Sequence, residues 1–184
     1  MIIFSQTLLK NNRNYLKNQP TNKKPEMSNI VSSPLGLIHL ISAIIALIAG
    51  MIVISNKKGT AFHKKVGYLY VFSMLVLNIT ALFIYRLTGG FNLFHIFVLA
   101  SLFSIVGGMS APLFNRKNKN WIITHLEVMS WSVVGLYAAF AAEISVRLVS
   151  PKYFWIAVFL SGGLLTTFGG IFIKRRKKQE LSNL

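Results

Sequence analysis

Residues 35–54 read LGLIHLISAIIALIAGMIVI, a run of 20 residues in which His39 is the one ionisable side chain. As a helix, such a run is about 30 Å long and matches the hydrocarbon core of a bilayer. It follows Pro34, a residue type that favours the first turn of a helix. Four similar runs follow, at residues 66–85, 91–113, 121–142 and 153–173. The sequence therefore predicts an all-α integral membrane bundle of five transmembrane helices, the first four forming the core.

The composition supports this class and excludes several others. The 184 residues are 53% hydrophobic and only 13% charged, about half the charge of a soluble domain. There is no cysteine and no aspartate, so disulfides, thiolate metal sites and paired-carboxylate mechanisms lack their residues. The formal charge is +16, but the basic residues lie between apolar runs and not on a folded surface. We therefore expect the lipid bilayer as partner, and no nucleic acid.

The distribution of the basic residues predicts the orientation of the spans. Three segments, the first loop, the third loop and the C-terminal tail, hold Lys57, Lys58, Lys64, Lys65, Arg116, Lys117, Lys119, Lys174, Arg175, Arg176, Lys177 and Lys178. The second and fourth loops hold only Arg86, Arg147 and Lys152. By the positive-inside rule the first group is cytoplasmic. We expect a bacterial plasma membrane protein with its N-terminus outside and residues 174–184 as a basic cytoplasmic tail.

Residues 1–33 form an Asn/Lys-rich N-terminal tail that we expect to be disordered. Its five basic residues would all lie outside, against the positive-inside rule. We hypothesise that the native chain starts at Met27, because the translocated tail would then carry no charged side chain. N-terminal sequencing that found Met1 would refute this. The transmembrane domain is expected to span residues 34–173.

The four histidines sort into two levels of the predicted bundle. His39 and His95 each lie about four residues into a span from the outside, whereas His125 lies about four residues into a span from the cytoplasm. His63 just precedes the second span, at the same cytoplasmic end. The two levels are roughly 20 Å apart at about 1.5 Å of rise per residue. Ionisable residues at membrane depth indicate function, so an outer pair (His39, His95) and an inner pair (His63, His125) are predicted sites.

Two imidazoles on facing helices are a ligand set for one haem b. Two such pairs would let an electron cross the bilayer, in exchange with quinone or a small reductant. Lys64 and Lys65 lie where haem propionates at the cytoplasmic face would meet them. Two alternatives stay open. The same four histidines fit another metal or a transport site, and an accessory or scaffold protein would use them for no chemistry.

Residues 59–68, GTAFHKKVGY, fit the pattern GTxxHxxxGY. With residues 74–82 and the region from His125 to Ser132, this segment resembles a family of small bacterial multi-pass membrane proteins, a domain of unknown function. The resemblance covers about residues 35–147 and implies no activity. His63-x-x-x-Gly67 at a span start is also similar to a pattern in cytochrome b561-type di-haem membrane proteins. That likeness implies histidines of helices i and i+2 holding two haems.

Other polar residues in the spans have structural interpretations. Glu127 lies two residues after His125 and is expected to pair with Lys64, Lys65 or a loop base, or to accept a proton in a relay. Glu143 and Arg147 are spaced for an i,i+4 ion pair, and Asn78 is expected to bond between helices. Glycines at 162, 163, 169 and 170 give the fifth span a smooth face. We expect this face to pack against a helix, within the chain or in a homo-oligomer.

Overall fold

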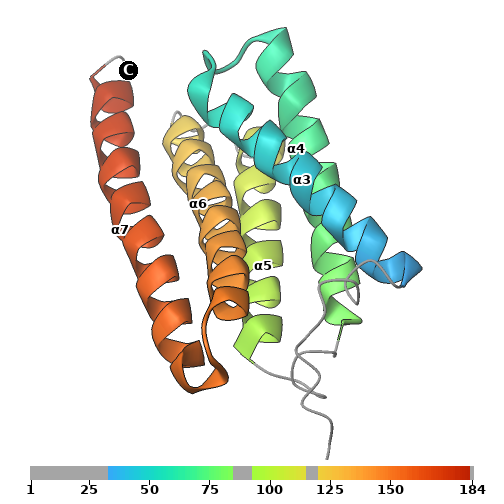
Figure 1. Ribbon diagram of the computed structural model, residues 1–184. Helices are drawn as coiled ribbons and strands as arrows, with labels where there is room; N and C mark the ends of the chain where they lie inside the picture. Colours follow the sequence, from blue (N-terminus) through green and yellow to red (C-terminus); the bar gives the residue numbers. More distant parts are fainter. Residues whose placement is uncertain (1–32, 85–92, 115–119, 183–184) are drawn as a thin grey trace, which may run out of the picture. The chain divides into compact units, whose positions relative to one another are not determined.

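A computed structural model of the chain describes residues 33–84, 93–114 and 120–182. Its elements are α3 (Pro34–Ser55), α4 (Ala61–Leu82), α5 (Leu93–Phe114), α6 (Trp121–Leu148), the 3-10 turn η1 (Pro151–Tyr153) and α7 (Phe154–Leu181) (Figure 1). Within these ranges there is no strand, and all five long helices are apolar and long enough to cross a membrane. The predicted all-α, five-span fold is confirmed. The N-terminal tail to residue 32, the start at Met27 and the bases Arg86, Arg116, Lys117 and Lys119 lie outside the described residues.

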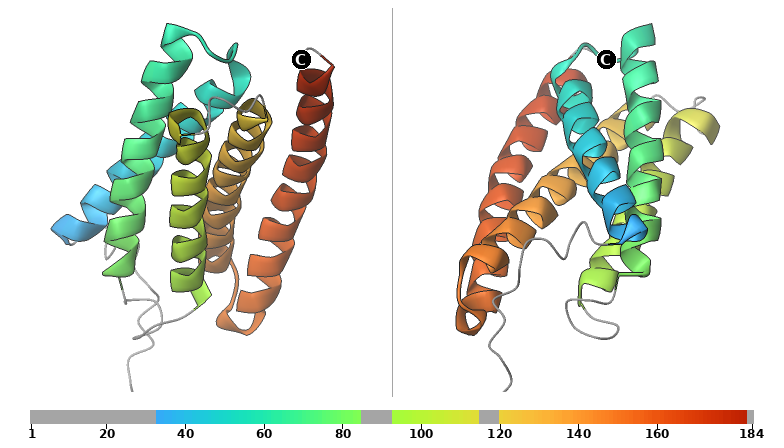
Figure 2. Two further views of the ribbon diagram at one scale, coloured as in Figure 1. Left: turned by 180° about the vertical axis from the view of Figure 1, so that it is seen from behind. Right: turned by 45° about the vertical axis from the view of Figure 1, so that its right-hand side comes forward.

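Four helices, α4 to α7, lie side by side in chain order, and α3 crosses α4 obliquely (Figures 1 and 2). The main contacts join α3 to α4, α5 to α6 and α6 to α7, and smaller ones join α4 to α5 and α3 to α6. This arrangement brings residues of α4 and α6, two helices apart in the chain, to the same interior.

The interior is built by the first four helices. Its least exposed large side chains are Tyr70 and Met74 of α4 and Ile105 of α5. Small residues of α3 and larger ones of α6 complete the cluster: Ala46, Ala49, Met129, Val133 and Leu136. No residue of α7 belongs to it. The prediction that the first four helices form the core is therefore confirmed.

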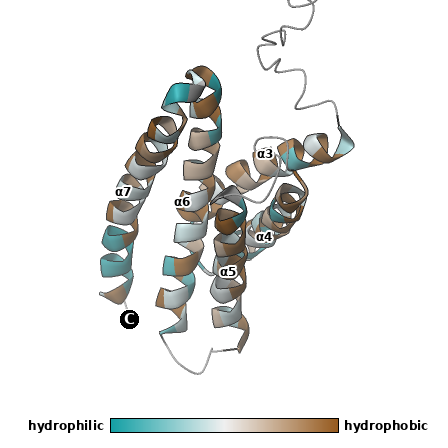
Figure 3. Ribbon diagram, turned by 90° about the horizontal axis from the view of Figure 1, so that it is seen from below, coloured by the Kyte–Doolittle hydropathy of each residue, from teal (hydrophilic) through white to brown (hydrophobic). Residues whose placement is uncertain are grey.

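Large apolar side chains cover the outside of every helix. Phe72 of α4 is 66% exposed and Phe103 of α5 is 78% exposed, values that would be costly in water. Figure 3 shows hydrophobic residues along all five helices and hydrophilic residues gathered toward the C-terminal end of α7. Such surfaces require lipid as the surrounding solvent, as expected for a multi-pass membrane protein.

The start of α4 differs from the prediction. We expected the span to begin at Val66, but the helix begins at Ala61. The cause is an N-cap: the Thr60 hydroxyl accepts a hydrogen bond from the backbone N–H of His63 at 3.1 Å. Gly59 precedes it with φ +77°, a conformation that favours glycine. His63 therefore lies inside the first turn of α4 and not before it.

The last two helices are longer than their apolar runs. In α6 the helix continues to Leu148 through the predicted ion pair of Arg147 with Glu143, which is confirmed. The last helix, α7, continues to Leu181, so most of the predicted basic tail is helical. Charged residues end an apolar run, but lysine, arginine and glutamate are good helix formers and do not end a helix.

Glycines on α7 allow it to approach α6 closely. A Cβ added at Gly169 would lie 2.5 Å from both methyl carbons of Val134, and one at Gly170 would lie 3.2 Å from the Trp131 ring. A Cβ at Gly162 or Gly163 would meet no described atom within 4 Å. Of the predicted smooth face, Gly169 and Gly170 thus pack against α6, whereas Gly162 and Gly163 do not. Homo-oligomerisation through the other half stays a prediction.

We predict that Gly169→Ala destabilises the protein in detergent by about 1–3 kcal/mol, because the new methyl group overpacks against a β-branched side chain. Gly162→Ala is the matched control and should leave the unfolding temperature nearly unchanged. The measurement is thermal unfolding of both purified variants, followed by helical circular dichroism. Equal shifts for the two variants would contradict this account of the α6–α7 contact.

Candidate histidine site between α4 and α6

The inner pair of histidines meets across the bundle. The rings of His63 on α4 and His125 on α6 have centroids 6.5 Å apart and an interplanar angle of 79°. Both rings are partly buried. The structure therefore brings together the two residues that were paired by their level in the sequence.

A second contact between the same two helices sets their register. Tyr70 lies seven residues after His63, and Ser132 lies seven residues after His125. The Tyr70 and Ser132 hydroxyls are hydrogen-bonded at 2.8 Å, and both residues are buried. Seven residues are two helical turns, so this contact lies about 10 Å deeper in the bundle. The α4 and α6 faces that carry the histidines therefore oppose each other over at least two turns each.

The ring of His125 has a defined tautomer. Its Nδ1 lies 2.8 Å from the carbonyl oxygen of Gly108 on α5. A carbonyl only accepts, so Nδ1 carries the proton and donates. In the neutral ring Nε2 then holds the lone pair. Histidines that ligate a metal commonly hold their second N–H in this way.

The Gly108 carbonyl needs this donor because of Pro112. In an α-helix the carbonyl of residue 108 would accept from the N–H of residue 112, but proline has none. In a membrane such a carbonyl must be satisfied by a neighbouring helix. Glycine also allows the approach, since a Cβ at position 108 would lie 2.5 Å from the Met129 sulfur. Sequence reasoning missed Gly108, although the proline four residues later is a readable signal.

His63 has an unmatched nitrogen. Its Nδ1 is buried and has no hydrogen-bond partner of good geometry among the described residues, although the ring interacts with the backbone of Val53. A Cβ added at Gly67, one turn further along α4, would meet no described atom within 4 Å. A buried imidazole nitrogen without a partner is costly unless a ligand supplies one. The lone pair of His125 Nε2 and the open position at Gly67 are the features of this end of the pair that a ligand would use.

The outer pair is arranged differently. His39 Nδ1 lies 3.0 Å from the Thr80 hydroxyl, which also lies within 2.9 Å of the carbonyl oxygens of Val76 and Leu77. Because the hydroxyl gives its single proton to a carbonyl, it accepts from His39 Nδ1–H, and Nε2 keeps the lone pair. His95 is buried in α5 at 3% exposure. The contacts of the described residues join His39 to Thr80 and not to His95.

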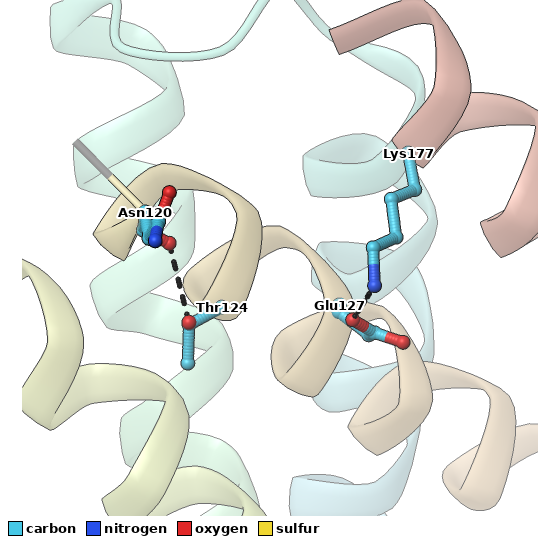
Figure 4. Close-up of polar contacts among 4 residues, drawn as sticks. All are labelled: Asn120, Thr124, Glu127 and Lys177. Carbon is cyan, nitrogen blue, oxygen red and sulfur yellow. Dashed lines mark hydrogen bonds and ion pairs between the residues drawn. The ribbon is translucent and has the colours of Figure 1, made fainter. Parts of the chain in front are cut away.

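Glu127 pairs with a base, but not with one of the two lysines expected. Lys177 of α7 places its Nζ 2.7 Å from Glu127 Oε2 (Figure 4). Lys64 and Lys65 are exposed at the start of α4. Glu127 therefore has a basic partner as expected, but this partner is Lys177 and neither Lys64 nor Lys65, because the helical extension of α7 brings Lys177 alongside α6. The interhelical bond predicted for Asn78 is confirmed, since its amide donates to the Ser101 hydroxyl at 3.0 Å.

The donor set at His63 and His125 limits what can bind. No group of three or more His, Cys, Asp or Glu side chains suited to a metal ion occurs among the described residues. Two nitrogens that share one metal at about 2 Å each lie about 4 Å apart, which places the ring centroids about 6 Å apart. The observed 6.5 Å is close to that value. Two imidazoles suffice where a cofactor brings the other ligands.

We predict that Pro112→Ala weakens the hydrogen bond between His125 Nδ1–H and the Gly108 carbonyl. The new backbone N–H would compete with the ring for the Gly108 carbonyl and weaken the bond from His125 Nδ1–H. The tautomer of His125 should then become mixed, as seen in ¹⁵N NMR spectra of ring-labelled protein. His39, which is held by Thr80, is the internal reference. An unchanged His125 spectrum would show that the carbonyl does not select the tautomer.

The fold defines a multi-pass helical membrane protein with a pair of facing histidines near one end. Residues 36–168 match the family model described as predicted membrane protein, DUF2306. The match covers most of the chain, and the chain belongs to this family. No curated protein and no solved structure matches the chain.

Proposed function

We propose that the protein is a transmembrane electron carrier that binds haem b between His63 and His125, with a second haem at His39 and His95. The observation that carries the proposal is the convergence of the His63 and His125 rings, 6.5 Å apart on facing helices. The defined lone pair on His125 Nε2 supports it.

The number of ligands favours haem over a bare metal ion. A structural zinc site takes four protein ligands and a catalytic one takes three. The two histidines have no third metal-binding partner among the described residues. The porphyrin would supply four nitrogens, and the two histidines would complete the set of ligands.

The chain's own residues would have separate tasks at this site. The Gly108 carbonyl would orient the His125 ring by accepting a hydrogen bond from Nδ1–H. This bond would also make Nε2 more basic, and therefore a better ligand for a metal. Gly67 would leave room beside His63, and Lys64 and Lys65 would meet the propionates. A bound haem b would supply a one-electron iron couple.

A second haem would extend the path across the bilayer. His39 is prepared in the same way as His125, with Nδ1–H held by Thr80 and the lone pair on Nε2. The partner reductant or quinone would exchange electrons at the two ends. By the positive-inside rule, we place the His63–His125 end and the C-terminus in the cytoplasm of a bacterial cell.

The test is expression of the full chain with added haem, purification in detergent, and absorption and electron paramagnetic resonance spectra. We expect a Soret band, two haems per chain and low-spin signals typical of two axial histidines. His63→Ala and His125→Ala should each remove one haem, whereas His39→Ala should leave the inner haem bound and serves as the matched control.

Two results would overturn the proposal. One is wild-type protein without haem while helical content and unfolding temperature are normal. The other is haem content unaffected by His63→Ala and His125→Ala. Elemental analysis of the same samples separates the alternatives. A metal that depends on these two histidines would indicate a metal or transport site. No cofactor, with no effect of replacing all four histidines, would indicate a scaffold protein.

A further inference from the structure

A narrow cleft opens where the α3–α4 loop, α6 and the end of α7 meet. Its polar lining consists of Lys58, Ser130, Arg176 and Glu180, which we call the basic cleft, and Leu126 and Phe172 are among its apolar neighbours. The space inside is about 20 Å3, enough for one water-sized group and too small for a quinone ring or a porphyrin.

Lys58 is held at the rim of the cleft by the end of α3. Its ammonium group donates to the carbonyl oxygens of Val53 at 2.7 Å and Ile54 at 3.1 Å. These carbonyls belong to the last turn of α3, where the helix provides no donor. Two of the three N–H groups of Lys58 are thus used, and one remains for a ligand. Burial and the positive charge of Arg176 lower the pKa of Lys58 to about 8, with Glu180 acting in the opposite direction.

Arg176 reaches the cleft because it lies on the face of α7 that is turned toward the other helices. Ile173, Arg176, Lys177 and Glu180 share one helix face and are the less exposed residues of this segment. Arg176 also packs its guanidinium over the Phe172 ring, 5.4 Å from the centroid. Arg175 and Lys178, their chain neighbours, are exposed on the other side. The cluster of bases at 174–178 therefore has an inward half and an outward half.

The inward half carries excess positive charge. Lys177 is matched by Glu127, which leaves Lys58 and Arg176 with Glu180 as the remaining carboxylate of the cleft. Two cations and a hydroxyl, against the single carboxylate of Glu180, leave a net positive charge around a space of one oxygen atom, which suits an anionic oxygen. Basic pockets at the cytoplasmic ends of membrane helices are places where anionic headgroups bind.

We propose that the basic cleft binds a phosphate oxygen of an anionic phospholipid headgroup, with Lys58 and Arg176 as the charged donors and Ser130 as a neutral one. The rest of the headgroup lies outside the cleft, among the exposed bases. The lipid tails lie along the apolar outer surface. Inorganic phosphate offers the same oxygen without the tails and is the competing source.

Binding depends on pH through Lys58. The charged groups that face it are Arg176 and Glu180 of α7 and His63 of α4. As pH rises from 7 to 9.5, Lys58 passes through its pKa of about 8 and loses its charge, whereas Arg176 stays protonated. Affinity for the anion is therefore nearly full at pH 7 and falls as the pH rises through about 8, and a bound anion raises the pKa of Lys58.

The test uses the full chain in neutral detergent, with short-chain phosphatidylglycerol, phosphatidylcholine and inorganic phosphate as probes and native mass spectrometry or calorimetry as readout. Phosphatidylglycerol should bind most tightly. Arg176→Gln should weaken it about five-fold, the effect of about 1 kcal/mol per charge. Arg175→Gln removes the same charge one residue away on the exposed side and should change affinity less than two-fold.

Equal losses for Arg176→Gln and Arg175→Gln would overturn the proposal, because attraction by overall charge would then explain the binding. Inorganic phosphate binding as tightly as the lipid would overturn the lipid assignment. If Arg176→Gln does not fold, the pH series on the wild type decides. Weakening of about five-fold between pH 7 and 9.5 supports the cleft, and a flat profile refutes it. Normal haem content in these variants keeps this test separate from that of the electron-carrier proposal.

Discussion

The hydrogen bond from His125 Nδ1 to the Gly108 carbonyl is the contact on which the site depends. Pro112 removes the backbone donor for this carbonyl, and a bilayer offers no water to replace it. The imidazole of a neighbouring helix provides the missing N–H at 2.8 Å. One bond therefore satisfies α5, joins α5 to α6 and fixes which nitrogen of His125 is the donor to a ligand. The missing backbone N–H at Pro112 and the tautomer of His125 are thus linked.

The same principle holds the other helices together. Lipid tails are as apolar as leucine, so helix association in a membrane depends on close packing and on polar contacts between helices. Tyr70 with Ser132 joins α4 to α6, and Tyr137 donates to the Leu47 carbonyl to join α6 to α3. Each such bond is modest in energy, about 0.6 kcal/mol in membranes. Their main effect is on orientation, because each bond fixes the rotation of a helix about its own axis.

The sequence predicted the features that depend on periodicity and length. Five apolar runs predicted five helices, and the similar depth of His63 and His125 predicted that they meet. The sequence did not predict contacts between residues far apart along the chain. Glu127 lies 50 residues from Lys177, and no local pattern joins them. The extent of α4 and α7 was also missed, because a threonine cap and the helix propensity of charged residues act outside the apolar runs. The cofactor stays a prediction, since imidazole geometry restricts the ligand without identifying it.

The short turn between α3 and α4 has a consequence for biogenesis. Only residues 56–60 separate the two helices, and Gly59 holds the turn with its positive φ. Five extended residues reach at most about 18 Å, so the end of α3 and the start of α4 must lie at the same face of the bilayer. If these two helices insert as a hairpin, the lysines at its tip remain on one side of the membrane, and they contribute to the direction of the spans that follow.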